Sequence, residues 1–468
     1  MCFVFASLVV VGCKVDEKVS YDILLKNGNV IDLETGTIAV QNVLITDGKI
    51  LKLLPPEDLT TVSAMQTIDA TDQFILPGFW DNHVHFRGGD SVIEANKDFL
   101  TLFMANGITT VRDAGGDLTT SVMEWKASIA SGALLGPTIY TSGPKIDGPN
   151  STWAGSLEVS DITDIEIALD SLESIPVDFI KLYDSRITGE HYLNTLKAAE
   201  KRNLISSGHM PFTVTLDETI DAGVDAVEHL YYIMKGCSAN EKEITERLAK
   251  KEIGFWDAMP LLMESYADTT AQKTFTKLKT NAIYVVPTLH IGEILSYLDE
   301  VNHENDPYLS FMDDGIVATY NGRVQRALNA SEQQTKDRKA LQRFFGELAK
   351  SLHDSGVGLL AGSDSGAFNS YTYPGISLHE ELAQMVRLGI SPLEALKTSA
   401  YNGARFLKKD SDYGNIAAGK IADIVILKGN PLQDISQTQN ISMVIKQGKA
   451  WEQKVLNDKL EALRNNTK

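Results

Sequence analysis

The feature that most constrains the fold of this chain is a series of short apolar runs that alternate with longer amphipathic segments. Each run is hydrophobic almost without a break, which is typical of parallel strands buried on both faces. The eight runs are FILPGFWDNHVHF (74–86), GITTVRDAGG (107–116), TIYTSGP (138–144), VDFIKLYD (177–184), LISSGHM (204–210), DAVEHL (225–230), YVVPTLHIG (284–292) and GVGLLAGSDSG (356–366). Eight parallel strands with intervening helices predict an α/β fold, a (β/α)8 TIM barrel.

The segments between the runs carry helical patterns of unequal length. Ser91 to Asn106 predicts a helix directly after the first strand, and Ile390 to Leu407 predicts the last barrel helix, which Ser391-Pro392 begins. Residues 235–280 and 291–350 are longer helical stretches. We expect them to form a cap over the mouth of the barrel.

Both ends of the chain have a sequence pattern that differs from the central part and is typical of strands joined by tight turns. Residues 21–68 and 414–451 are rich in β-branched residues, with Asn-Gly and Asp-Gly at candidate hairpin positions in the first stretch. Two such pieces predict one small discontinuous β-sandwich made from both chain ends. The expected boundaries are 1–19 for a signal and linker segment, 20–75 and 410–468 for the two parts of the sandwich, and 76–409 for the barrel.

Charge and cysteine content narrow the range of partners. A formal net charge of −19 disfavours nucleic acid and anionic membrane surfaces, because a polyanion would be repelled. The three cysteines, Cys2, Cys13 and Cys237, are too few for a disulfide framework. A small-molecule substrate is the expected partner, and the sequence leaves open whether the protein forms a homo-oligomer.

The N-terminal segment predicts a lipid anchor. Residues 4–12 are apolar, and Val10-Val11-Gly12-Cys13 resembles a bacterial lipobox, in which the cysteine is acylated. No Lys or Arg precedes Cys13, although a signal peptide normally starts with a basic stretch, so a start upstream of Met1 is one alternative. We expect a lipoprotein that faces the periplasm of a bacterial cell envelope; without the anchor the protein would be cytoplasmic.

Polar residues interrupt the apolar runs where predicted strands end. They are His83 and His85 after the first strand, Lys181 after the fourth, His209 after the fifth, His229 after the sixth and Asp364 after the eighth. Barrel enzymes carry their catalytic groups at this end of the strands. Residues i and i+2 of a strand point the same way, so His83 and His85 can face one ion. Imidazole and carboxylate are common ligands of zinc and similar divalent ions, and the pattern predicts a metal site.

Lys181 determines which kind of metal site is expected. An ammonium group buried beside divalent cations is costly unless it is paired or loses its charge. A neutral amine can take up CO2 to form a carbamate, whose two oxygens can bridge two metal ions. The alternative is a salt bridge from Lys181 to a neighbour such as Asp184.

These residues and their surroundings resemble the amidohydrolase superfamily over nearly the whole chain. The resemblance rests on LPGFWDNHVHF, NGITTVRDAGG, FIKLY, His209, VEHL, VVPTLHIG, AGSDSG, SPLEALKTSAYNGA and AAGKIADIVIL. Within the superfamily the chain is similar to the imidazolonepropionase-like and Xaa-Pro dipeptidase (prolidase) groups. Imidazolonepropionases use one metal and lack the bridging lysine, so Lys181 favours the binuclear, dipeptidase-like branch.

The resemblance implies a site with two divalent metal ions, expected to be zinc. It assigns His83, His85 and Asp364 to the buried ion, His209 and His229 to the more exposed ion, and carbamylated Lys181 to both. Asp364 would take a proton from the attacking hydroxide and return it to the leaving amine. Tyr231 could donate a hydrogen bond to the developing oxyanion. His290 could line the substrate pocket. Arg112 and Asp113, which end the second strand, could orient the ligands or form a structural pair, and we expect the pair.

The expected activity is hydrolysis of the amide bond of a dipeptide or an N-acyl amino acid. The same ligands also serve lactonases, phosphotriesterases and hydrolases of cyclic amides. A deaminase is less expected, since that branch typically uses one metal and no bridging lysine. A non-enzymatic scaffold is disfavoured because all six predicted ligands are present.

Overall fold

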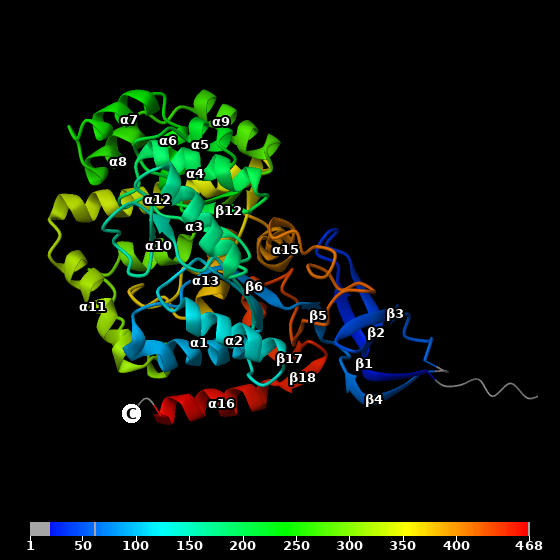
Figure 1. The fold of residues 1–468 in the computed structure, drawn as a ribbon. Coiled ribbons are helices and arrows are strands. Elements are labelled where there is room, and N and C mark those ends of the chain that lie inside the picture. The colour runs from blue at the N-terminus through cyan, green and yellow to red at the C-terminus, as the bar shows by residue number, and fades with distance from the viewer. Residues whose placement is uncertain (1–18, 60–61, 467–468) are drawn as a thin grey trace, which may run out of the picture.

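The computed structural model describes residues 19–59 and 62–466 and contains the predicted barrel (Figure 1). Its eight strands are β6 (Phe79–Val84), β7 (Ile108–Asp113), β8 (Thr138–Thr141), β11 (Ile180–Leu182), β12 (Ser206–Gly208), β13 (Ala226–Glu228), β14 (Tyr284–Val286) and β15 (Gly358–Leu359). All pairs between neighbouring strands are parallel. Each strand falls within one of the predicted apolar runs, and the predicted fold class is confirmed.

Backbone hydrogen bonds close the barrel at two seams where the strand ladders end. Asp178 N–H donates to Thr141 O over 2.9 Å, which joins β8 to the segment before β11. Asn82 N–H donates to Ala361 O over 2.9 Å, which joins β6 to the segment after β15. Two additional short strands, β9 (Ile146–Asp147) and β10 (Leu157–Glu158), extend the sheet beside β11. The sequence patterns did not predict β9 and β10.

Helices surround the barrel, and side-chain caps begin several of them. Asp161, Thr188, Thr215 and Ser331 each accept hydrogen bonds from the first turn of the helix that follows. The helices between barrel strands are α1 (Ile93–Ala105), α2 (Thr119–Ala130), α3 (Ile162–Ser174), α4 (Gly189–Lys201), α5 (Leu216–Asp221), α6 (Tyr231–Gly236), α7 (Glu241–Ala249), α8 (Phe255–Glu264), α9 (Asp268–Thr280), α10 (Leu289–Ser296), α11 (Asp314–Leu328) and α12 (Glu332–Asp354).

The two long helical stretches predicted from the sequence are helical. Residues 235–280 contain α7, α8 and α9, and residues 291–350 contain most of α10 together with α11 and α12. Figure 1 shows α7, α8 and α11 on the side of the barrel that lies away from the terminal strands. Thr319 of α11 accepts a hydrogen bond of 2.7 Å from Phe368 N–H. This contact places α11 against the loop that follows β15.

After β15 the chain forms α13 (Ile376–Arg387) and then the predicted last helical segment, which is interrupted. Ser391 caps α14 (Pro392–Leu396), and α15 (Asn402–Phe406) completes the segment. Between them, Ser399 has non-helical dihedral angles. Its hydroxyl accepts from Trp80 N–H and donates to Trp80 O, both over 2.8 Å. The kink therefore attaches this segment to β6.

The two ends of the chain form one eight-stranded sheet. It contains β1 (Val19–Ile31), β2 (Ile38–Thr46), β3 (Lys49–Leu54), β4 (Val62–Asp69), β5 (Phe74–Pro77), β16 (Ile424–Leu427), β17 (Ile441–Lys446) and β18 (Lys449–Glu452). β5 pairs antiparallel with β16, which joins the two ends of the sequence. Ile50 N–H donates to Lys420 O over 2.8 Å, so the sheet curls round until β3 meets the segment before β16. The expected sandwich is thus a single curled sheet around its own apolar core.

One of the two predicted hairpin turns is correct and the other is wrong. Asp47-Gly48 joins β2 to β3 with φ of 51° and 72°, as a tight hairpin turn requires. Asn27-Gly28 lies inside β1 at a register shift between β1 and β2. Its left-handed Asn27 makes a β-bulge, because pairing with β2 continues on both sides of it.

The chain continues beyond β18 into α16 (Gln453–Asn466), which was not predicted. Figure 1 shows α16 below α1, and Gln453 Nε2 donates to Ala105 O, at the end of α1, over 2.9 Å. Among the described residues, no helix combines the length and apolar character needed to cross a membrane. The predicted anchor residue Cys13 lies outside the described residues.

A buried ion pair attaches the terminal sheet to the barrel. Lys446 of β17 forms a 2.6 Å pair with Asp423, and its ammonium also donates to Thr109 O (3.0 Å) and Thr138 Oγ1 (2.6 Å). Lys446 is 6% exposed and Asp423 is 4% exposed. Thr109 belongs to β7 and Thr138 to β8, so this one ammonium connects β17 to two barrel strands.

We predict that Lys446→Met destabilises the protein, because it leaves the Asp423 carboxylate buried without its partner. Breaking such a pair typically costs about 3–5 kcal/mol. Thermal and urea unfolding should show the loss. The double variant Lys446→Met/Asp423→Asn should be less destabilised than the single variant. A single variant as stable as wild type would contradict this role.

Candidate metal centre

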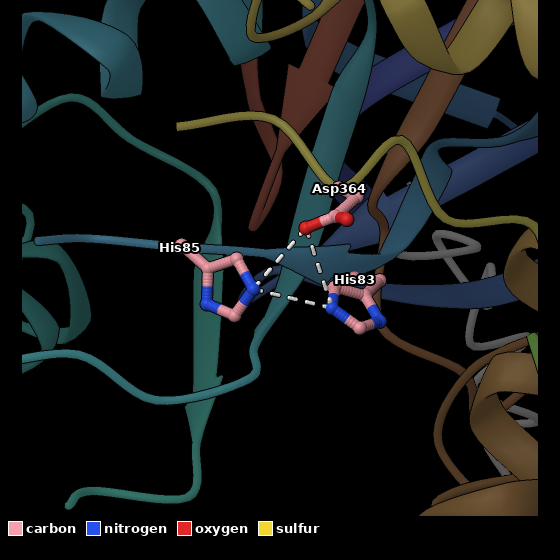
Figure 2. A group of neighbouring side chains, drawn as sticks. All are labelled: His83, His85 and Asp364. Atoms are coloured by element: carbon pink, nitrogen blue, oxygen red, sulfur yellow. Dashed lines mark hydrogen bonds and ion pairs between the residues drawn. The ribbon is translucent and has the colours of Figure 1, made fainter. Parts of the chain in front are cut away.

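Three of the predicted ligands form a compact buried group at the mouth of the barrel (Figure 2). His83 and His85 lie at the end of β6, and Asp364 follows β15. His85 Nε2 is 3.2 Å from Asp364 Oδ1 and 3.2 Å from His83 Nε2, while His83 Nε2 is 3.5 Å from Asp364 Oδ1. One ligand atom from each residue lies within 4.8 Å of the others, an arrangement that could hold a metal ion.

The remaining two histidines lie beside this group. The rings of His83 and His229 have centroids 5.2 Å apart, and those of His209 and His229 are 4.9 Å apart. His229 Nε2 is 3.9 Å from Asp364 Oδ2. The four histidines therefore form a continuous series around Asp364, as the strand-end positions predict.

Every one of the four imidazoles is held through its Nδ1 atom. His83 contacts Glu228 (2.5 Å), His85 contacts Gly115 O (2.8 Å), His209 contacts Asp184 (3.1 Å) and His229 contacts Thr288 Oγ1 (2.7 Å). Donation from Nδ1–H leaves the Nε2 lone pair of each ring available as a ligand. Burial lowers the pKa of His83, His85 and His229 and favours the neutral form that binds metal.

Glu228 is a functional residue that the sequence analysis missed. It is fully buried, and its carboxylate contacts His83 on one oxygen and Arg112 (2.9 Å) and the Ser207 hydroxyl on the other. The only signal in the sequence was an acidic residue directly before His229. Of the two expectations for Arg112 and Asp113, the structural pair is wrong, because Arg112 reaches across the barrel to Glu228 while Asp113 accepts from the Thr141 hydroxyl (2.7 Å). Arg112 instead acts on a predicted ligand indirectly, through the carboxylate that contacts His83.

Lys181 is 1% exposed, and its ammonium nitrogen has no hydrogen-bond partner. Its nearest carboxylate is Glu228, at 3.7 Å, and burial lowers the pKa of Lys181 to about 8. The alternative of a salt bridge to a neighbour is therefore met by Glu228 and not by Asp184, whose carboxylate contacts His209 and the Tyr232 hydroxyl (2.8 Å). The Lys181 nitrogen thus has Glu228 as an ion-pair neighbour but makes no hydrogen bond among the described residues, which leaves it available for a further bond.

The segments that carry His229 and Asp364 turn sharply where their strands end. His229, Thr288 and Asp364 have φ of 66°, 49° and 56°, in the left-handed region that non-glycine residues rarely adopt. Asn369 donates to Asp364 Oδ1 over 2.7 Å and also bonds the Asp364 carbonyl. Such backbone strain persists only where surrounding contacts impose it, and here two of the three residues are predicted ligands.

Tyr231 and His290, the predicted substrate contacts, occupy different positions relative to the centre. Tyr231 begins α6, packs edge-on against Phe345 with centroids 4.9 Å apart, and has a pKa raised by burial. His290 lies in the first turn of α10, where its backbone N–H donates to Glu381 over 2.7 Å and burial lowers its pKa to about 4. Within the described residues, the His290 ring takes no part in the hydrogen bonds around Asp364.

The donor set fits a divalent metal ion. Four imidazoles whose Nδ1 atoms are already held, together with one carboxylate, are ligands that zinc and similar ions prefer. The carboxylate or carbonyl behind His83, His85 and His209 is the kind of support that orients metal-bound histidines, and a threonine hydroxyl takes this place behind His229. His83, His85 and Asp364 are the most compact subset.

We predict that Glu228→Gln weakens metal binding about 10- to 100-fold, as loss of a partner behind a metal-bound histidine typically does. The amide keeps the shape but removes the negative charge that holds both His83 and Arg112. Competition with a chromogenic chelator measures the change. Glu241→Gln, in α7, is the matched control and should bind metal like wild type; equal affinity of both variants would exclude the proposed support by Glu228.

Solved structures with similar folds cover nearly the whole chain. A bottromycin amidohydrolase matches with a TM-score of 0.75 and 20% identity, over 95% of this chain and 90% of the other. A Xaa-Pro dipeptidase with methionine bound in its active site matches with a TM-score of 0.67 and 19% identity, over 92% and 99%. The ochratoxinase of A. niger has a TM-score of 0.67 and 19% identity, over 92% and 95%. At these identities the likeness concerns the fold.

Curated relatives match over short segments only. A dihydroorotase of Streptococcus pneumoniae serotype 4 is 46% identical over 90 residues, which are 19% of this chain and 21% of that protein. An adenine deaminase of Halalkalibacterium halodurans is 34% identical over 90 residues, which are 19% of this chain and 14% of that protein. The matches thus span less than a quarter of either relative.

A family model covers far more of the chain than these segments. The model described as the amidohydrolase family matches residues 74–451, a range that contains every barrel strand and all six predicted ligands. The sequence-based prediction of a hydrolase that acts on carbon–nitrogen bonds is confirmed at the level of the family. The chain belongs to the amidohydrolase family.

Proposed function

We propose that this protein hydrolyses the amide bond of a dipeptide or an N-acyl amino acid at a centre that holds two divalent metal ions, expected to be zinc. The observation that carries the proposal is the convergence of four Nδ1-anchored histidines around Asp364, with a buried lysine nitrogen nearby that makes no hydrogen bond to any described residue. A single ion would be satisfied by His83, His85 and Asp364. His209, His229 and Lys181 are the ligands left for a second ion.

Lys181 would join the two halves of the centre as a carbamate. Its neutral amine attacks the carbon of CO2, which forms an N–C bond and releases one proton. The product has two oxygens that can bind two ions and one negative charge that suits a cationic centre. The support for this step is that the Lys181 nitrogen is buried without a hydrogen-bond partner.

Divalent cations bound here would lower the pKa of a water molecule and polarise the scissile carbonyl. Asp364 would accept the proton of the attacking water and return it to the leaving amine. Asn369 holds this carboxylate in place by donating to Oδ1. Asp364 thus combines the roles of ligand and proton carrier.

The proposed substrate contacts are Tyr231 and His290. The Tyr231 hydroxyl would donate a hydrogen bond to the oxyanion, a role compatible with the raised pKa that keeps the phenol protonated. His290, half-buried at the start of α10, would line the pocket. The lipid anchor at Cys13 and a position in the cell envelope also remain proposals.

The test of the proposed function is a screen of zinc-loaded full chain against dipeptides and N-acyl amino acids, with amino acid release as the readout. Release by wild type alone, and not by Lys181→Met, would establish a dipeptidase or acylase. No release by protein shown to contain metal would contradict the proposal. It would favour the alternatives on the same centre, namely cyclic amides, lactones or phosphotriesters.

Lys181→Met is predicted to lose metal and activity together, because methionine fills the same volume but cannot form a carbamate. Elemental analysis after dialysis should show less metal per chain than wild type. Lys235→Met is the control, since Lys235 of α6 is also buried but donates to Val214 O and pairs with Glu241. Full metal content in Lys181→Met would contradict the bridging role.

Asp364→Asn is predicted to lower kcat more than metal affinity. The amide oxygen can still serve as a ligand, but the group can no longer accept a proton. We expect kcat to fall by roughly 10²- to 10⁴-fold, the usual contribution of general acid–base catalysis. A variant that loses metal in proportion to activity would show that Asp364 acts only as a ligand.

A further inference from the structure

His229 is held by a side chain that lies at the start of a helix. Its Nδ1 is 2.7 Å from the hydroxyl oxygen of Thr288, and Thr288 directly precedes α10. The other three imidazoles are held by a carboxylate or by a backbone carbonyl. A threonine hydroxyl can point in several directions, so the orientation of the His229 ring depends on how the backbone of Thr288 is fixed.

Thr288 does not cap the helix that it begins. A threonine at this position normally has an extended backbone, and its hydroxyl accepts from an N–H group of the first turn. Thr288 instead has φ of 49° and ψ of 53°, and within the described chain no N–H of the first turn of α10 donates to its hydroxyl. The hydroxyl is therefore available to His229, but the N–H groups at the start of α10 need another acceptor.

Glu381 of α13 supplies that acceptor from a different helix. Its Oε2 accepts from His290 N–H over 2.7 Å, and its side chain is fully buried. Burial raises the pKa of Glu381 to about 7, and the N–H groups of His290 and Leu289 oppose this rise. Among the described residues, Oε1 has no hydrogen-bond partner. The start of α10 is therefore the part of the protein that stabilises this buried carboxylate.

The segment from Val286 to His290 connects Glu381 to the metal centre. At one end, His229 N–H donates to Val286 O over 2.8 Å, and at the other end His290 N–H donates to Glu381. Thr288 lies between these two contacts in the left-handed region, which a β-branched residue adopts only where its surroundings impose it. The bond to Glu381, two residues after Thr288, is one of the contacts that impose it.

We propose that Glu381 is a positioning residue for the metal centre: it caps α10 in place of Thr288 and thereby keeps the Thr288 hydroxyl directed at His229. The Nε2 lone pair of His229 then stays directed at the more exposed metal ion. This inference rests on the proposed function, because it needs His229 to be a ligand of a second ion, but it does not depend on which amide is cleaved. The ion assigned to His83, His85 and Asp364 should not depend on Glu381.

The test removes zinc stepwise from the metal-loaded full chain with a chromogenic chelator, in bicarbonate buffer. Wild type should release two ions, and His229→Ala, which removes a ligand, identifies the step that belongs to the more exposed ion. In Glu381→Leu, the affinity of that step should fall about 10- to 100-fold, as it typically does when the support of a metal-bound histidine is lost. The other step should match wild type, and two unchanged steps would overturn the proposal.

A conservative variant and a control separate positioning from stability. Glu381→Gln keeps an oxygen that can accept from His290 N–H and should retain most of the affinity. Asp161→Ala removes the cap of α3, which accepts from Thr163 and Asp164 N–H, and should lower the melting temperature without changing either metal step. Equal losses in Glu381→Leu and Asp161→Ala, or a loss of both steps in Glu381→Leu, would show that affinity follows overall stability and would overturn the proposal.

Variants of Thr288 test the same link, also if Glu381→Leu does not fold. Thr288→Val removes the hydroxyl and keeps the shape, so it should weaken the step of the more exposed ion, whereas Thr288→Ser should not. When Thr288 is valine, Glu381→Leu should add little further loss, because its effect passes through the missing hydroxyl. Equal affinity in Thr288→Val and Thr288→Ser, or additive losses in the double variant, would overturn the proposal.

Failure of this inference can be distinguished from failure of the proposed function. A wild type that binds a single ion would contradict the two-ion centre and, with it, the role of Glu381. A wild type that binds two ions, together with a Glu381→Leu variant that binds both equally well, would overturn only the role of Glu381. Neither result requires a substrate, because metal affinity is the readout.

Discussion

The metal centre depends on the seam at which the barrel closes. β6 and the segment after β15 are separated by about 280 residues in sequence, and three backbone hydrogen bonds join them. Asn82 N–H donates to Ala361 O (2.9 Å), Asp364 N–H to His83 O (2.7 Å) and His85 N–H to Ser365 O (2.9 Å). The bonds alternate along the two segments, so they fix the register in which Asp364 meets both histidines. A shift of one residue would turn His83 and His85 away from it.

Side-chain hydrogen bonds next to the seam stabilise this register. The buried Asp81 carboxylate accepts from Ser363 N–H (2.9 Å) and from the Ser363 hydroxyl (2.5 Å), which ties the segment after β15 to β6 a second time. A second carboxylate, that of Glu228, joins β13 to His83 of β6 and to Arg112 of β7. The histidine on β6 is thus oriented by a carboxylate that comes from a different strand. The same contacts that close the barrel also determine the direction of the Nε2 lone pairs.

The sequence predicted the positions of the strands and the strand-end placement of the candidate ligands, because both depend on local patterns. Apolar runs mark buried strands wherever they occur, and a polar residue at the end of a run marks the barrel mouth. The partners of the ligands were not predictable in this way. Glu228 finds Arg112 across the barrel, and Asp184 supports His209 rather than Lys181, because those choices depend on which strands become neighbours in space. The wrong prediction of a hairpin turn at Asn27-Gly28 has the same cause. The dipeptide is typical of such turns, but the pairing of β1 with β2 on both sides makes it a bulge.

The buried basic side chains of this protein fall into two groups, those paired with a buried carboxylate and those without such a pair among the described residues. Arg112 is buried at 1% exposure but has the Glu228 carboxylate as its partner, and Lys446 has Asp423. Such pairs hold elements together, and breaking one of them destabilises the fold. Lys145 is buried to the same degree, yet the described residues supply it with no counter-ion. Burial and the neighbouring Arg87 lower the pKa of Lys145 well below its usual range, so the charged form is disfavoured where no acidic side chain of the described residues pairs with the amine.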